Sequence, residues 1–136
     1  MSVEVLLREI KKNLQADVVA IAEWKKKEAS IQWSHTIGMN TNKHLHVRIL
    51  YGLGIVGKVM QSGTPMYYYS DAEAHEDPLV YSESLKSFFL VPLASGASLP
   101  SVMMVGYRTP VDLPGEKQWA LWRNLLTEKL KGGEPL

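Results

Sequence analysis

Residues 51–58 read YGLGIVGK, and Gly52, Gly54 and Gly57 within them reproduce the G-x-G-x-x-G spacing of dinucleotide-binding turns. In a dinucleotide-binding unit, the glycines follow the first strand and open a helix long enough to return to a parallel strand. Here the stretch after Gly57 allows barely two helical turns before Gly63. The spacing therefore predicts a tight turn into a short helix, and we expect no nucleotide cofactor.

This glycine turn is expected to present backbone amides at the amino end of the short helix. Gly52 and Gly54 allow backbone angles that other residues resist, and Gly57 permits close packing of the helix on the sheet. The N–H groups of residues 54–56 would then face open space, where an anion or a carbonyl oxygen binds well. The alternative is a structural turn whose amides are capped locally.

Length and charge exclude several classes of protein. The chain has 136 residues, with 15 Lys and Arg against 14 Asp and Glu. This length predicts one domain, expected over residues 1–131 with 132–136 as a flexible tail. Near-neutral charge gives no large field for nucleic acid or anionic lipid, so neither partner is expected. The amino terminus lacks a signal-peptide core and no apolar run approaches membrane-spanning length, which predicts a cytoplasmic protein.

Catalytic and metal chemistry find little support in the sequence. There is no cysteine, which excludes disulfides, thiolate metal sites and cysteine nucleophiles. No nucleophile elbow or paired-carboxylate spacing is present, so we expect neither an enzyme nor a bound cofactor. His44 and His46 would share one side of a predicted strand, but no third metal ligand is evident and solvent-facing histidines are the simpler interpretation.

A second group of possible metal ligands also has two interpretations. It consists of Glu73, His75, Glu76 and Asp77. Such a cluster can attract a divalent cation. Acids at the start of a helix more often interact with the helix dipole, and we favour that role.

Apolar periodicity predicts an α+β chain. The expected strands cover residues 17–24, 30–37, 46–50, 66–69, 87–94 and 101–108, with helices over 3–15, after the glycine turn and from Pro114 onward. The runs 87–94 and 101–108 are the most apolar and are predicted to form a central antiparallel pair. This order indicates one mixed sheet with the terminal helices on one face and irregular elements on the other.

The ordered motifs resemble the GAF domain family. They are R-x-L-x-G-x-G-I-x-G-x-V over 48–59, Gly-Thr-Pro at 63–65, a strand ending at Asp71, L-K-S at 85–87, V-P-L at 91–93 and V-G-Y-R at 105–108. The resemblance spans about residues 3–130. It implies a central antiparallel or mixed sheet, with the terminal helices on one face and a ligand pocket of loops and short helices on the other. It also implies a small-molecule sensor that is commonly dimeric through its terminal helices.

Within this family, further motifs narrow the resemblance. Bilin-carrying and free methionine-sulfoxide reductase members require cysteine, and the N-K-x-x-F-D-E signature of cyclic-nucleotide members is not found. The motifs I-x-W at 31–33, D-P-L-V at 77–80 and E-S-L-K-S-F at 83–88 look most like stand-alone nitrate-receptor members. Those members bind nitrate and restrain a partner sensor histidine kinase. The resemblance thus implies such a partner and a homodimer.

The same resemblance implies a ligand pocket on five residues: Trp33, Ile55, Val56, Pro78 and Leu79. Nitrate is a flat monoanion, so converging N–H groups and one aromatic ring can hold it without a lysine.

Asp77 stands where the resemblance implies an aromatic residue. An ionised carboxylate would repel nitrate strongly in a pocket of low dielectric constant. Either Asp77 points outward and caps the turn that begins at Pro78, which we favour, or the ligand is not an anion. Two further readings are a GAF sensor for a different small molecule and a ligand-free dimerisation or docking module. In the docking module, Trp33 and the tyrosines of 67–69 would fill the cavity.

Overall fold

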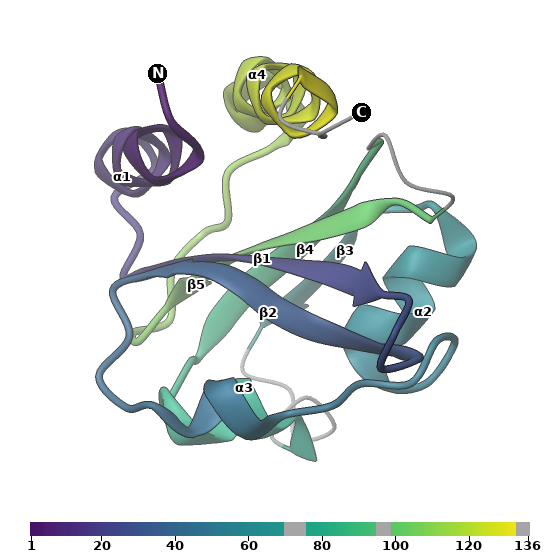
Figure 1. Cartoon of the computed structure of the whole chain (residues 1–136). Coiled ribbons are helices and arrows are strands. Elements are labelled where there is room, and N and C mark those ends of the chain that lie inside the picture. Colours follow the sequence, from purple (N-terminus) through teal and green to yellow (C-terminus); the bar gives the residue numbers. More distant parts are fainter. Residues whose placement is uncertain (70–75, 95–98, 133–136) are drawn as a thin grey trace.

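The computed structural model describes residues 1–69, 76–94 and 99–132 (Figure 1). The strands are β1 Val18–Lys25, β2 Ser30–Ile37, β3 Met66–Tyr69, β4 Ser87–Leu93 and β5 Ser101–Tyr107. The helices are α1 Val3–Asn13, the 3-10 helix η1 Lys43–His46, α2 Gly54–Ser62, α3 Pro78–Ser82 and α4 Glu116–Gly132. The strands form one sheet in the order β2-β1-β5-β4-β3, and every pair is antiparallel. The α+β prediction and the antiparallel β4–β5 pair are confirmed.

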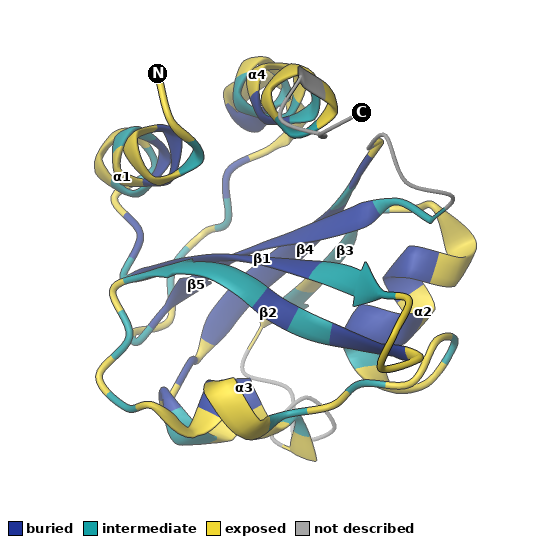
Figure 2. Ribbon diagram, in the orientation of Figure 1, coloured by how far each residue is buried: buried dark blue, intermediate teal, exposed yellow. Residues whose placement is uncertain are grey.

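The two faces of the sheet carry separate cores, because successive strand residues point to opposite sides. Along β1, Val19 and Ile21 pack toward α1 and α4, whereas Val18, Ala20 and Ala22 face α2 and α3. Figure 2 shows α1 and α4 on one side of the sheet and buried segments of α2 on the other. The terminal helices therefore lie together on one face, as predicted. The opposite face is left to the short helices and loops.

The helix α1 shows how the terminal helices are held. Ser2 caps its amino end by accepting a hydrogen bond from the Val5 N–H at 3.2 Å. Its apolar stripe buries Leu7 and Ile10 completely, and each such side chain contributes roughly 1.5–3 kcal/mol. Among the described helices, none combines the length and apolar character needed to span a membrane.

The strand predicted over residues 46–50 is wrong. Residues 43–46 form η1, and the following segment joins the sheet only through Ile49, which exchanges backbone hydrogen bonds of 2.8 and 2.9 Å with Ile31. The chain then leaves the sheet to enter the glycine turn. His44 is buried beside Thr36, at 3.4 Å, while His46 is exposed. The two histidines do not share a strand face, and the premise of a shared metal site fails.

Glu83, at the carboxyl end of α3, has a buried carboxylate that binds two other segments. It accepts hydrogen bonds from the N–H groups of Asn40 and Thr41, at 2.7 and 3.0 Å, and pairs with Arg108 at 2.6 Å. Arg108 also donates to the carbonyl oxygens of Glu83 and Gly38, each at 3.0 Å. Burial opposes ionisation of the carboxyl, but the hydrogen bonds from Asn40, Thr41 and Arg108 outweigh it and lower its pKa.

Replacing Glu83 with Gln should destabilise the fold by about 1.5–3 kcal/mol at neutral pH, because it removes the negative charge that accepts hydrogen bonds from Asn40, Thr41 and the partly exposed Arg108. Since the folded-state pKa is lowered, the stabilisation is present above the ordinary value of 4.5 and disappears as the pH falls through the lowered pKa. Urea unfolding at neutral and acidic pH measures the loss of stability in the variant and its dependence on pH. The control is Glu116→Gln at the exposed 3.8 Å pair with Arg123, expected to cost less than about 1 kcal/mol. Equal stability of the two variants would contradict the assignment.

Candidate functional site

The glycine turn places the amino end of α2 at the sheet. Gly52 and Gly54 have φ of +79° and +65°, in the left-handed region. A Cβ on Gly57 would lie 2.3 Å from the Leu50 carbonyl oxygen, so only glycine permits this approach. Leu53 is the N-cap residue and makes no side-chain capping bond. The side chain of Leu53 therefore does not cap the first-turn amides of α2.

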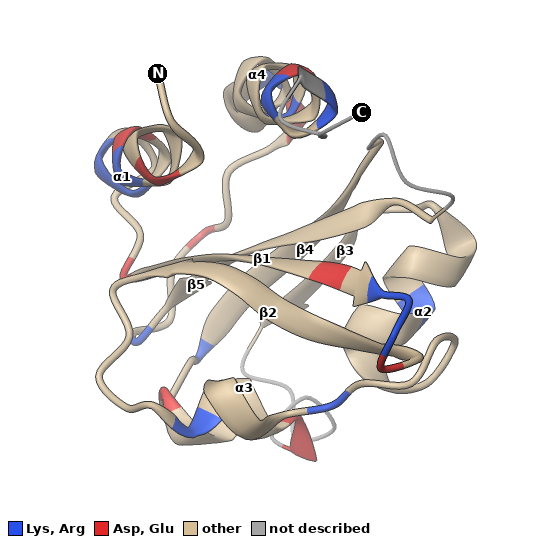
Figure 3. Cartoon of the chain, in the orientation of Figure 1, with Lys and Arg blue, Asp and Glu red and all other residues tan. Residues whose placement is uncertain are grey.

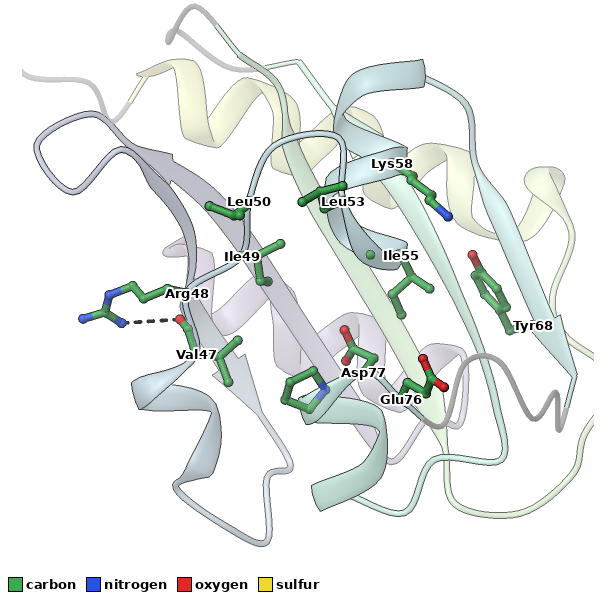
Figure 4. A pocket seen from close by; sticks show the side chains of 12 residues that line it. Val47, Arg48, Ile49, Leu50, Leu53, Ile55, Lys58, Tyr68, Glu76 and Asp77 are labelled. Atoms are coloured by element: carbon green, nitrogen blue, oxygen red, sulfur yellow. Dashed lines mark hydrogen bonds between the residues drawn. The ribbon is translucent and has the colours of Figure 1, made fainter.

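An open pocket of about 760 Å³ lies beside this helix end (Figure 4). Its walls come from the segment before α2, from α2 itself, from β3 and from the start of α3. The lining residues are Val47, Arg48, Ile49, Leu50, Leu53, Gly54, Ile55, Lys58, Tyr68, Glu76, Asp77 and Pro78. Of the five predicted site residues, Ile55 and Pro78 line the pocket. The other three, Trp33, Val56 and Leu79, are buried in the apolar core on the same face of the sheet.

Trp33 has a polar atom without a partner. Its side chain extends from β2 into the core shared with α2 and α3, and the residue is only 7% exposed. Its indole Nε1 is buried and has no hydrogen-bond acceptor within the described part of the chain. A buried donor left unpaired costs about 1–3 kcal/mol, and such groups are few in native proteins. The Nδ1 of His44 is also buried without a hydrogen-bond partner among the described residues, and no sequence pattern predicts this burial.

Asp77 has the predicted capping role, but its carboxyl does not point outward as predicted. Its Oδ2 accepts hydrogen bonds from the N–H groups of Leu79 and Val80 at 3.0 and 3.1 Å, which caps α3. The carboxyl nevertheless lines the pocket, as Figure 4 shows. Burial raises the pKa of Asp77, partly offset by the bonds from Val80 and Leu79. The Leu79 amide, expected to reach a ligand, already has an acceptor.

Two cations at the pocket were missed by sequence reasoning. Arg48 donates to the Val47 carbonyl oxygen at 3.3 Å, and Lys58 stands on α2 one turn after Gly54. Residues four apart share a helix face, so the position of Lys58 was available from the sequence. Glu76 and Asp77 contribute acids to the same pocket. The lining is thus of mixed charge over an apolar floor.

The tyrosines of β3 divide between the faces, as alternation requires. Tyr68 lines the pocket and stacks on Phe88, with ring centroids 4.9 Å apart. Tyr67 faces the terminal helices, where its hydroxyl accepts a hydrogen bond from the Trp119 Nε1 at 2.9 Å. The pocket stays open despite these rings. Glu73 and His75 of the acidic cluster, and Asp71 at the end of a predicted strand, lie outside the described residues. The described residues hold no group of three metal-ligating side chains.

Comparison with known proteins gives matches only at the level of structure. No protein-family model and no curated protein matches the chain.

Several solved structures superpose over most of the chain. A Staphylococcus aureus NreA mutated in its nitrate-binding site shares 25% identity, with a TM-score of 0.75 over 88% of this chain and 94% of that one. The GAF domain of an Acinetobacter phosphoenolpyruvate-protein phosphotransferase shares 19%, with a TM-score of 0.73 over 93% and 78%. The GAF domain of a Bacillus halodurans two-component sensor histidine kinase shares 14%, with a TM-score of 0.69 over 94% and 90%. The chain therefore has the GAF fold and is similar, over most of its length, to NreA.

Proposed function

We propose that this chain is a sensor of a small planar anion, with nitrate as the first candidate. The observation that carries the proposal is the buried, unpaired indole N–H of Trp33 on the pocket side of the sheet. A ligand oxygen would supply the missing acceptor. The similarity to NreA, which has a nitrate-binding site, supports the same ligand class.

The donors for such an anion would be Trp33 and the first turn of α2. The amides of Gly54, Ile55 and Val56 carry the positive end of the helix dipole and have no side-chain cap from Leu53. Arg48 and Lys58 at the pocket would raise the local concentration of an anion. Pro78 would close the pocket on the α3 side. The buried side chain of Leu79 would belong to the apolar core behind the ligand.

A larger small molecule is the second candidate ligand. A volume of about 760 Å³ falls in the range of pockets that enclose organic ligands, and it exceeds what nitrate requires. The mixture of Lys58 with Glu76 and Asp77 would suit a ligand carrying both charges. A ligand-free docking module is less well supported, because the pocket stays open although Tyr68 lines it.

The sensor would act through another protein. On the resemblance to nitrate receptors, we propose a cytoplasmic single domain over residues 1–131 that modulates a partner sensor histidine kinase. We also propose a homodimer through the terminal helices, where Val5, Leu121 and Leu125 are exposed apolar residues. Light scattering tests the dimer, and the mass of a single chain would contradict it.

Isothermal titration with nitrate should show saturable binding that weakens by about tenfold in Trp33→Phe, which corresponds to one lost hydrogen bond of about 1.4 kcal/mol. Phenylalanine keeps an aromatic ring in the core and removes only the N–H donor. The matched control is Trp119→Phe, whose indole bonds to Tyr67 on the opposite face. Chloride serves as the ligand control. Unchanged affinity in Trp33→Phe would show that the indole does not bind the ligand. A flat titration of the wild type would exclude nitrate as the ligand.

Nitrate affinity should rise as the pH falls, because protonation of Asp77 removes a like charge from the pocket. Its raised pKa brings this change above the ordinary value of 3.8. Asp77→Asn should bind about tenfold or more tightly at neutral pH and lose the pH dependence, since like charges in contact repel by several kcal/mol even at an effective dielectric constant of about 20. Asparagine preserves the helix cap.

The control for this pH dependence is Glu76→Gln, which removes an exposed pocket charge and should change affinity much less. Affinity that is independent of pH in the wild type would show that Asp77 does not face the bound anion.

A further inference from the structure

The mouth of the pocket carries three large apolar side chains that face solvent. Leu50, Tyr51 and Leu53 are 56%, 40% and 57% exposed, all within four residues of one another. We call these three residues the mouth ridge. Leu50 and Leu53 also line the pocket, so the ridge and the ligand site share a wall (Figure 4). Clustered exposed apolar groups mark interaction sites more often than scattered ones do.

The ridge has a fixed backbone. Hydrogen bonds between Ile49 and Ile31 fasten its start to β2, at 2.8 and 2.9 Å. The Leu53 N–H donates to the Leu50 carbonyl oxygen at 3.1 Å, and the Gly52 N–H donates to the Gly57 carbonyl oxygen at 3.0 Å. A preformed surface loses little conformational entropy when a partner binds. The apolar side chains are therefore presented ready for contact.

Cations surround this ridge. Because Ile49 pairs antiparallel with Ile31, Leu50 and Tyr51 run beside the turn that carries Lys26 and Lys27. Figure 3 shows basic segments at the β1–β2 turn and on α2, which holds Lys58. None of the four flanking cations, Lys26, Lys27, Arg48 and Lys58, forms an ion pair among the described residues. Their charges are free to meet acids on another molecule.

We propose that the mouth ridge is the docking surface for a partner protein segment that carries both apolar side chains and carboxylates. The apolar side chains would cover the ridge, and the carboxylates would pair with the flanking cations. A segment seated there lies over the pocket opening. If the pocket binds a ligand, as proposed above, that ligand would change the affinity of the chain for the segment.

Two other occupants fit the surface less well. A second copy related by two-fold symmetry would bring the same four cations against each other. A lipid surface of uniform negative charge would meet Glu28 and Glu76 as well as the lysines, because both acids border the same surface and are exposed. A folded partner can place its acids opposite the cations alone.

Fluorescence anisotropy with two synthetic amphipathic peptides tests the proposal. One has leucines on one helical face and glutamates on the other, and its counterpart replaces every glutamate with lysine. The acidic peptide should bind at least about tenfold more tightly than the basic one. The double variant Leu50→Gln, Leu53→Gln should weaken acidic-peptide binding by about tenfold or more. The control Tyr69→Gln alters an exposed apolar residue of β3 that lies on the same face of the strand as Tyr67, across the sheet, and should bind as the wild type does.

Four results would overturn the proposal. They are equal or absent binding of the two peptides, loss of binding in the Tyr69→Gln control, a dimer in light scattering that the ridge variant dissociates, and binding only to vesicles of phosphatidylglycerol. The peptide titrations need no nitrate. Ridge-dependent peptide binding together with a flat nitrate titration would leave this proposal standing while the anion-sensor proposal fails.

Discussion

The buried carboxylate of Glu83 is the constraint on which the site depends. It joins the segment around Asn40 and Thr41 to the end of α3, and its pair with Arg108 fixes both to the end of β5. The helix α3 is only five residues long and cannot hold its place by its own hydrogen bonds. With its carboxyl end fixed by Glu83 and its amino end capped by Asp77, it forms a stable wall of the pocket.

Much of the fold could be predicted because its signals are local. The apolar runs of β4 and β5 and the helical stripe around Leu7 and Ile10 appear directly in the sequence, and the structure has them as expected. The strand prediction for residues 46–50 was wrong because these strand-forming residues make only one bridge to the sheet, at Ile49, before the chain turns away. The burial of His44 depends on a contact with Thr36 that no local pattern encodes.

The candidate site shows the same division. The capping role of Asp77 follows from its place before Pro78, but the direction of its carboxyl depends on how α3 packs against the segment before α2. The unpaired indole of Trp33 could be identified only once the core around it was known. Two adjacent tyrosines of β3 add a link between the faces, since Tyr68 lines the pocket and Tyr67 bonds to Trp119 of α4.

The most direct test of the account is a nitrate titration followed by backbone amide and indole N–H resonances in solution. If the anion binds between α2 and the sheet, the amides of Gly54, Ile55 and Val56 and the Trp33 indole should shift together along one saturation curve. The Leu79 amide, already bonded to Asp77, should move less. Shifts confined to surface residues, or no shifts at all, would contradict the central claim that this pocket senses a small anion.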